Sequence, residues 1–203
     1  MENVNEIEAR TEPSLDGRSK HFIVDAKRSR FTVQAFAVGI LSAIGHNPTI
    51  GIRTFSGEVD FAPETLEAGG FRLTIQTSSL GVLDDISDKD RKEIERVMKA
   101  DVLEVDKFPE ICYETPSPIS VSKIDGSLFS ATLNGSLTLH GVTRGEAVHI
   151  RIVSMGEMLR ASGEFTLNQS SYQIKPVSVA GGALKLKDEL RLSFEMVAYR
   201  QNP

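Results

Sequence analysis

The segment from Leu128 to Gly141, with the sequence LFSATLNGSLTLHG, constrains the fold more than any other part of the chain. Apolar and polar residues alternate along it almost without interruption, and the apolar positions share one side: Phe129, Ala131, Leu133, Leu137 and Leu139. This period of two is typical of an antiparallel strand with one face sealed from water, and it excludes a helix. At roughly 3.3 Å per residue the strand is much longer than the usual five or six residues, which favours a barrel wall. The sequence therefore predicts a container.

Composition limits the class of protein. The 203 residues are 40% hydrophobic, which suffices for one large core. The net charge is −5 with acidic and basic residues interleaved, so a nucleic-acid partner is not expected. The one cysteine, Cys112, permits no intramolecular disulfide, and it alternates with apolar neighbours as a core residue does. The four histidines lie in separate segments without an HxH or HxxxH pair, so neither a metal site nor a set of catalytic residues is predicted.

The N-terminal segment differs from the rest of the chain. Residues 1–20 are rich in glutamate and contain no apolar run, whereas a secretory signal needs a basic start followed by about 7–15 apolar residues. No segment approaches the ~18 consecutive apolar residues that a transmembrane helix needs. We therefore expect a flexible acidic arm over residues 1–20, one barrel domain over residues 21–203, and a soluble, cytoplasmic protein without a transmembrane segment.

Segments with a period of two recur along the chain and predict roughly ten strands. HFIVD from His21 and RFTVQAFAVGIL from Arg30 are expected to pair as a first hairpin across the polar tetrad AKRS. A bulge is expected at Ser56–Gly57, and Asp125–Gly126 is a strong hairpin-turn signal. Sequential hairpins close most simply as an up-and-down antiparallel barrel, an all-β fold without exposed edges.

The period changes at Ser87. The sequence SDKDRKEIERVMKA places Ile94, Val97 and Met98 at helical spacing, and its acidic first turn complements the helix dipole. One helix is therefore expected over about residues 87–100. Its narrow apolar stripe and charged outer face place it across an end or a flank of the barrel, either as a structural cover or as a moving lid.

Small residues interrupt the inward-facing rows of the predicted strands. Ala35, Ala37, Gly135 and Gly163 all occur at such positions. A barrel of about eight strands or more can hold one small ligand where the inward side chains do not fill it. The gaps predict either a channel through the barrel or a close fit to bulky residues opposite, and both interpretations remain open from the residues alone.

Six segments of the chain match the pattern of a known family: FSGEVDF at 55–61, TSSL at 77–80, VLEVDKFPEICYE at 102–114, GSLTLHGVTR at 135–144, FTLNQSSY at 165–172 and LKDELRLSFEMVAY at 186–199. With these segments the chain resembles the YceI-like, or polyisoprenoid-binding, family of bacterial lipocalin-like proteins. DRKEIERVMKADVLEV replaces the Arg-Asp-x-His-Leu-like segment that commonly precedes the Phe-Pro turn. The resemblance implies an extended lipocalin-like barrel whose apolar tunnel holds a long-chain lipid, either a polyprenyl phosphate or an isoprenoid quinone. It implies carriage or storage of that lipid, with no catalytic cofactor.

The resemblance implies that the inward-facing residues of the predicted strands line the tunnel. These residues are Phe31, Val33, Ala35, Ala37, Phe55, Phe71, Leu73, Ile75, Phe129, Ala131, Leu133, Leu137, Leu139, Phe165, Leu192, Phe194 and Met196. An isoprenoid chain is held by burial alone, so specific polar contacts are needed only at its head. The candidates for those contacts are His46, Asn47 and Arg53, which follow one another in a connection between strands that offers donors and a cation.

Two other functions remain open at this point. One is an enzyme that acts on a buried amphiphile, with His46 or Glu58 as an acid–base group near the tunnel mouth. The other is an interaction module with a filled barrel, whose binding surface is the charged helix from Ser87 to Ala100. A homodimer through exposed strands is compatible with each of these functions.

Overall fold

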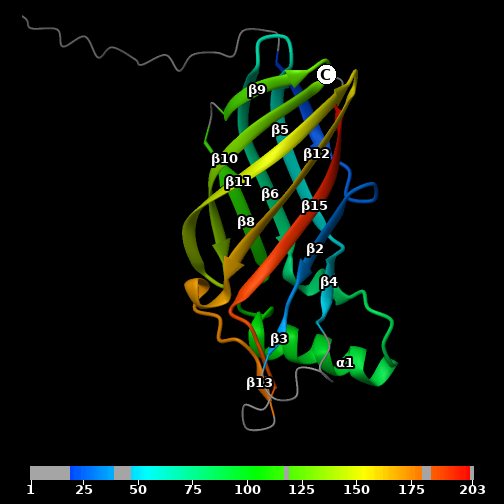
Figure 1. Ribbon diagram of the computed structural model, residues 1–203, viewed down its shortest axis with the longest axis vertical. Helices are drawn as coiled ribbons and strands as arrows, with labels where there is room; N and C mark the ends of the chain where they lie inside the picture. Colours follow the sequence, from blue (N-terminus) through cyan, green and yellow to red (C-terminus); the bar gives the residue numbers. More distant parts are fainter. Residues whose placement is uncertain (1–18, 39–46, 117–118, 180–183, 202–203) are drawn as a thin grey trace, which may run out of the picture.

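The computed structural model describes residues 19–38, 47–116, 119–179 and 184–201, and it shows an elongated β-barrel with a helix at one end (Figure 1). The strands of the barrel sheet are β1 Lys20–Val24, β2 Arg30–Gln34, β4 Thr49–Ile52, β5 Phe55–Ala62, β6 Glu67–Gln76, β7 Leu80–Val82, β8 Glu110–Thr115, β9 Ile119–Asp125, β10 Leu128–Leu139, β11 Val142–Met155, β12 Met158–Asn168 and β15 Glu189–Arg200. A small second sheet contains β3 Ala37–Val38, β13 Ser178–Val179 and β14 Leu184–Leu186. The helical elements are α1 Asp88–Val97, the π-helix η2 Met98–Val102, and the short 3-10 turns η1 Thr77–Ser79 and η3 Gln169–Tyr172.

Pairing of the strands gives eight antiparallel walls that follow the order of the chain. Four of these walls are each made of two short strands that lie end to end and pair with the same neighbouring walls. They are β1 with β2, β5 with β4, β6 with β7, and β8 with β9. The other four walls are the continuous strands β10, β11, β12 and β15. The ring closes where Phe22 of β1 pairs with Arg200 of β15. The predicted all-β, antiparallel barrel is therefore confirmed.

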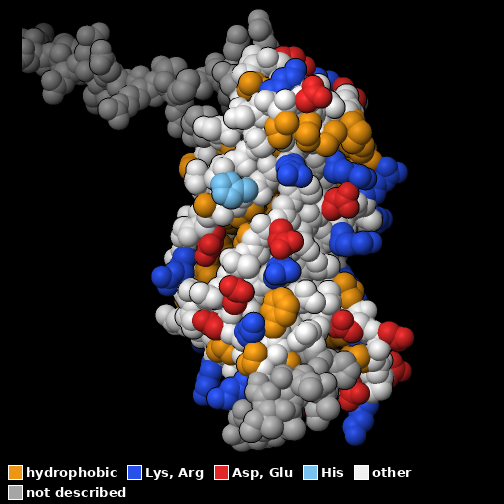
Figure 2. All heavy atoms as spheres, viewed as in Figure 1, with side chains coloured by type: hydrophobic (Ala, Val, Ile, Leu, Met, Phe, Trp, Pro, Cys, Tyr) orange, Lys and Arg blue, Asp and Glu red, His pale blue; other side chains and the backbone are white. Residues whose placement is uncertain are grey.

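The surface of the barrel is charged and mixed in sign. Lys and Arg side chains alternate with Asp and Glu side chains across the face in Figure 2, and hydrophobic side chains gather near its upper end. Several of these charges form ion pairs between neighbouring strands, such as Arg72 with Glu114 at 2.9 Å and Arg160 with Glu195 at 3.0 Å. Exposed pairs of this kind contribute little to stability, and the core carries most of it.

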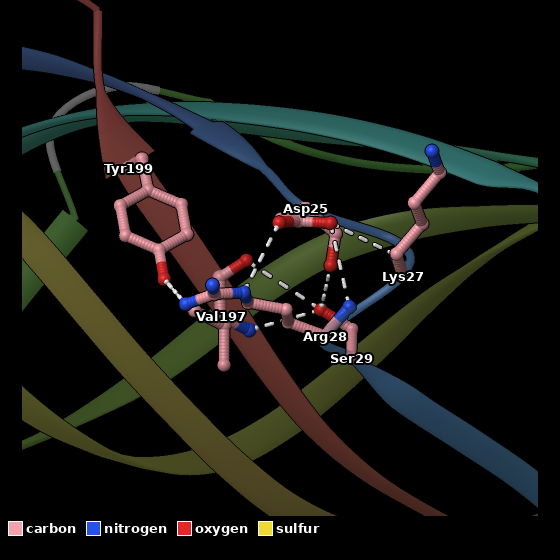
Figure 3. Close-up of polar contacts among 6 residues, drawn as sticks. All are labelled: Asp25, Lys27, Arg28, Ser29, Val197 and Tyr199. Carbon is pink, nitrogen blue, oxygen red and sulfur yellow. Dashed lines mark hydrogen bonds and ion pairs between the residues drawn. The ribbon is translucent and has the colours of Figure 1, made fainter.

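The predicted first hairpin is wrong, because β1 and β2 do not pair with each other. Both lie against β15, and the loop between them folds onto that strand (Figure 3). The Ser29 hydroxyl donates to the Asp25 carbonyl at 2.7 Å and accepts from the Val197 amide at 2.9 Å, while the Asp25 carboxylate accepts from the Lys27 amide at 2.9 Å. The Arg28 guanidinium donates to the Tyr199 hydroxyl. The polar tetrad is thus a loop between the two strands of one wall, and side-chain contacts stabilise it. The turn signal in the sequence does not distinguish such a loop from a hairpin turn.

Two other predicted strands are also corrected. The strand predicted from Arg30 breaks after Gln34, and the Ala35 amide there donates to the Pro48 carbonyl at 3.1 Å. The residues beyond the break, including Ala37, join the small sheet instead of the wall. The bulge expected at Ser56–Gly57 lies further along β5, where the register with β6 shifts between Val59 and Phe61.

The predicted helix is confirmed, and it covers an edge of the barrel sheet. It begins after Ser87, whose hydroxyl accepts from the Asp90 amide at 3.1 Å as an N-cap. One turn apart on α1, Arg91 donates to the Val82 carbonyl at 2.6 Å and Glu95 accepts from the Val82 amide at 2.9 Å. Because β7 ends the path of paired strands, these two side chains bond to backbone groups that no further strand engages. The helix therefore stands at the end of the barrel as a cover anchored to β7.

Candidate functional site

The interior of the barrel contains an elongated cavity of about 590 Å³. Its lining comes from every wall, and at the helix end α1 contributes Ile94 and Val97 and η2 contributes Met98. The lining is apolar almost throughout, and its exceptions include Tyr113, Gln169, Glu93 and Lys185. The volume falls within the range of about 300–1,000 Å³ that ligand pockets occupy. The barrel is thus hollow, which contradicts the filled-barrel alternative.

Most residues of the predicted tunnel lining border this cavity: Phe31, Val33, Ala35, Phe71, Leu73, Ile75, Ala131, Leu133, Leu137, Leu139, Phe165, Leu192, Phe194 and Met196. Three predicted residues do not. Ala37 lies in the small sheet, and Phe55 is buried at 6% exposure in the core without bordering the cavity. Phe129 packs edge-on against Phe61 with ring centroids 5.7 Å apart, at the end away from the helix. Period-two patterning therefore identified inward-facing positions, while contact of these side chains with a ligand stays a prediction.

The two glycines that were expected to leave gaps do not leave them empty. A Cβ atom at Gly135 would lie 2.6 Å from Cζ of Tyr113, and one at Gly163 would lie 2.7 Å from Cζ of Phe194. Aromatic rings therefore occupy the space that these glycines leave. The cavity is instead bordered by short or aliphatic side chains such as Ala131 and Ala161, together with the apolar stripe of α1.

Two buried tyrosines donate hydrogen bonds to Glu146, and one of them, Tyr113, borders the cavity. The Tyr113 hydroxyl donates to the carbonyl oxygens of Leu133 at 2.8 Å and of Glu146 at 3.0 Å. Burial raises the pKa of Tyr113 to about 12, and the nearby Glu146 carboxylate adds to that rise. Tyr172 is fully buried and donates to the Glu146 carboxylate at 2.6 Å, and burial followed by that hydrogen bond raises its pKa further. Both phenols are therefore neutral hydrogen-bond donors at physiological pH, and neither is a base.

Comparison with known proteins assigns the chain to a family. The model of the YceI-like domain matches residues 22–198. The chain belongs to the YceI-like family. No curated protein matches it.

Solved structures share the fold of this YceI-like chain at low sequence identity. BcnA of Burkholderia cenocepacia is 18% identical with a TM-score of 0.62, and the match covers 86% of this chain and 98% of BcnA. A polyisoprenoid binding domain from Saccharophagus degradans, implicated in plant cell wall breakdown, is 13% identical with a TM-score of 0.65, covering 89% and 98%. The YCEI protein of Campylobacter jejuni is 16% identical with a TM-score of 0.55, covering 78% and 88%. Each of these matches supports the barrel architecture.

Of the three predicted head-group residues of this YceI-like chain, the two that the structure describes do not border the cavity. His46 lies outside the described residues, as do residues 1–18 of the expected N-terminal arm. The Asn47 side chain accepts from the Ala37 amide at 2.7 Å and so joins the small sheet to the start of β4. The guanidinium of Arg53 and the carboxylate of Glu95 both lie beside Gly81, each 3.0 Å from the position that a Cβ atom would take there. Neither Asn47 nor Arg53 borders the cavity. A head-group role for His46, Asn47 and Arg53 remains a prediction.

Glu58, the acid–base candidate of the enzyme alternative, is also absent from the cavity lining. Its side chain is half-exposed on β5, with its carboxylate 3.8 Å from Nε2 of His21. A position of Glu58 near the tunnel mouth therefore stays a prediction. Among the residues that the structure describes, no three His, Cys, Asp or Glu side chains lie close enough together to hold a metal ion. None of the helices in that part of the chain is long and apolar enough to cross a membrane.

The sequence reasoning missed a contact that joins the helix region to the barrel. Nε2 of His140 lies 2.7 Å from a carboxylate oxygen of Glu104, and the His140 ring packs on Phe108 with centroids 4.3 Å apart. His140 and Gly141 form the turn between β10 and β11 with φ angles of +52° and +73°. The HGVT motif indicated the turn, but Glu104 is far away in sequence and no local pattern pairs it with His140.

Proposed function

We propose that this YceI-like protein binds and carries or stores a long-chain isoprenoid lipid in its barrel, without acting on it chemically. A polyprenyl phosphate and an isoprenoid quinone are the two ligand types in question. The observation that carries the proposal is the apolar cavity of about 590 Å³, which extends from the aromatic end of the barrel to α1. The description of the Saccharophagus degradans relative as a polyisoprenoid binding domain supports the same class of ligand.

The composition of the lining suits a chain more than a compact polar molecule. Burial of each CH₂ contributes about 0.8 kcal/mol, so several isoprene units give a gross gain that exceeds the association cost of roughly 4–15 kcal/mol. Tyr113 borders the cavity, but its hydroxyl already donates to two backbone carbonyl oxygens. The wall therefore offers burial along its length and few donors that a polar ligand could use.

Filling the cavity with protein tests this function. Ala161 lies on β12 and borders the cavity, so Ala161→Phe places a ring where the chain would lie. Ala147 is exposed on β11, so Ala147→Phe adds the same ring to the outer surface as a matched control. We expect delipidated wild type and Ala147→Phe to take up a polyprenol or an isoprenoid quinone, and Ala161→Phe to lose most of that uptake. Failure of the wild type to bind any polyprenyl or quinone probe would refute the proposed function.

A further inference from the structure

The barrel wall forks between β11 and β12. The two strands pair from Met155 and Met158 only as far as Ile150 and Gly163. Beyond that pair β11 continues against β10, and β12 continues against β15. The far end of the fork is filled by η3, where the Tyr172 hydroxyl donates to Glu146. The wall next to Gly163 therefore lacks a continuous ladder of hydrogen bonds between these strands.

A second hollow, of about 790 Å³, lies at this fork and extends over β9 and β10. It shares Ile119, Ala131, Ile150 and Phe194 with the lining of the interior cavity. Phe194 belongs to β15 and faces the interior, and the hollow reaches it beside Gly163, where the ring occupies the space that a Cβ atom would fill. Figure 2 shows hydrophobic side chains at the floor of a hollow among polar side chains. The outer hollow and the interior cavity therefore approach each other through the fork.

The outer part of the hollow is rich in hydrogen-bond donors around one cation. Arg151 of β11 pairs in register with Ser130 of β10 and with Ser162 of β12, and Ser130 pairs in turn with Ser122 of β9. Within the described residues, no hydrogen bond or ion pair engages the Arg151 guanidinium or the hydroxyls of these three serines. Arg151 is exposed, and a planar guanidinium flanked by hydroxyls suits the oxygens of a phosphate.

Three other polar side chains of the hollow, those of Thr132, His149 and Glu164, are already engaged. Nδ1 of His149 lies 2.9 Å from Oγ1 of Thr132. The carboxylate of Glu164 forms an ion pair with Arg191 at 3.4 Å, which offsets its repulsion of an anion. These contacts leave Arg151 as the cation of the hollow that is free to bind an anionic group.

We propose that the β11–β12 fork is a side portal of the barrel, and that Arg151 binds the phosphate of a lipid whose chain enters the interior there. This inference rests on the proposed function and specifies the head group and the route of the chain. The competing location is the helix end, where Lys185 borders the interior cavity. The two locations predict different effects of substitution.

Binding of matched lipids tests the phosphate site. The probes are a polyprenyl monophosphate and the neutral polyprenol of the same chain length, measured with wild type, Arg151→Gln, Lys185→Gln and Arg160→Gln. Arg160 is the control, because it lies outside the hollow and pairs with Glu195. We expect Arg151→Gln alone to weaken the monophosphate about 10-fold, as loss of a charge-assisted hydrogen bond does, and to leave the polyprenol unchanged. Inorganic phosphate should not compete, because it lacks the chain.

The outcomes separate this inference from the proposed function. Equal affinities of wild type and Arg151→Gln for the monophosphate would overturn the portal site, and so would a selective loss in Lys185→Gln. Competition by inorganic phosphate alone would show a free anion site and would also overturn it. If wild type binds neither the polyprenol nor the monophosphate, the carrier function itself fails.

Blocking the portal tests the route independently of charge. In a Cys112→Ala background, Ser162→Cys places a thiol at the hollow, and Thr166→Cys places one further along the exposed face of the same strand. A bulky maleimide on Ser162→Cys should slow uptake of the neutral polyprenol strongly, whereas the same label on Thr166→Cys should not. Equal uptake rates for the two labelled proteins would overturn the portal.

Discussion

The two ends of the barrel are closed in different ways. At the end away from the helix, Phe22, Phe61 and Phe129 are at most 3% exposed, and Phe61 and Phe129 meet edge-on. At the other end the cover is α1 with η2, whose inward side chains Ile94 and Met98 are only partly buried. The three phenylalanine rings form a packed plug. The cavity lies between this plug and the helix, and Phe61 borders it from the plug side.

This difference separates stability from binding within one barrel. The plug contributes tightly packed contacts, and removal of one ring there leaves a new void. The helix end already borders empty space, so its side chains have fewer contacts to lose. We therefore expect substitutions at the plug to lower the free energy of unfolding, and substitutions along the cavity to affect uptake of lipid first.

A charge inside the cavity should give the largest effect. Leu137 faces inward with 7% exposure, so Leu137→Arg buries a guanidinium among apolar side chains and should lower the free energy of unfolding by about 4 kcal/mol or more. The protein should then either unfold or lose lipid uptake, as chemical denaturation and a binding assay would show. Thr138 faces outward and bonds to Thr143 at 2.8 Å, so Thr138→Arg should do neither. If both variants fold and bind alike, the two faces of β10 are assigned wrongly.

Removal of one phenylalanine from each region sharpens the comparison. Phe129→Ala removes a ring from the plug and should lower the free energy of unfolding by about 3–5 kcal/mol, with lipid affinity retained in the folded protein. Phe165→Ala removes a half-buried ring that borders the cavity, and it should cost markedly less stability while it weakens lipid binding. Urea denaturation and lipid titration of both variants measure the difference. Equal losses of stability would mean that the cavity end is packed as tightly as the plug.

Alkaline pH should loosen the wall beside the cavity. Burial raises the pKa of Tyr113 from 10.0, the ordinary value of a tyrosine, to about 12 in the folded protein, so the folded state favours the protonated phenol. The resulting contribution, on the order of 2–3 kcal/mol, is fully present below pH 10 and is lost as the pH rises toward 12. Denaturation midpoints across this range should therefore fall.

Tyr113→Phe is the control for that pH dependence. It should cost about 1 kcal/mol at neutral pH through the lost hydrogen bonds, and it should show a smaller fall in stability above pH 10. Some fall remains, because the pKa of Tyr172 is raised as well. A pH profile identical to that of the wild type would show that Tyr113 is not the group responsible.

Loss of the helix cap should have the smallest effect and should stay local. Ser87→Ala removes the hydroxyl that accepts from the Asp90 amide, which should destabilise α1 by about 1 kcal/mol. Hydrogen exchange should quicken in the first turns of α1 and remain unchanged in β9 and β10 near the plug. Ser87→Thr keeps the cap and should restore protection. Faster exchange throughout the barrel would contradict the separation of the two ends.

The continuous walls were predictable from sequence because each strand buries one whole face. The alternation from Leu128 onward matches β10 to its last residue, Leu139, and the change of period at Ser87 marks the helix start. The YceI-like membership was also predictable, because the six matching segments lie within or overlap the region of the family match.

The interrupted walls and the site were harder to predict from the sequence, because they depend on contacts between residues that are distant in the chain. Ser29 bonds to Val197, and this contact turns an expected hairpin into an insertion within one wall. The rings of Tyr113 and Phe194 occupy the space beside Gly135 and Gly163, and no local pattern shows which ring fills which gap. The fork beside Gly163 arises where two regular strands part, which alternation alone does not reveal.

The central claim is that the cavity between the aromatic plug and α1 holds an isoprenoid chain. Native mass spectrometry of protein purified gently from its source, followed by solvent extraction, tests it most directly. We expect a stoichiometric adduct that is released by the solvent and identified as a polyprenyl phosphate or an isoprenoid quinone. Protein that emerges without an adduct, and remains so after incubation with excess polyprenyl phosphate, polyprenol and quinone, would contradict the claim.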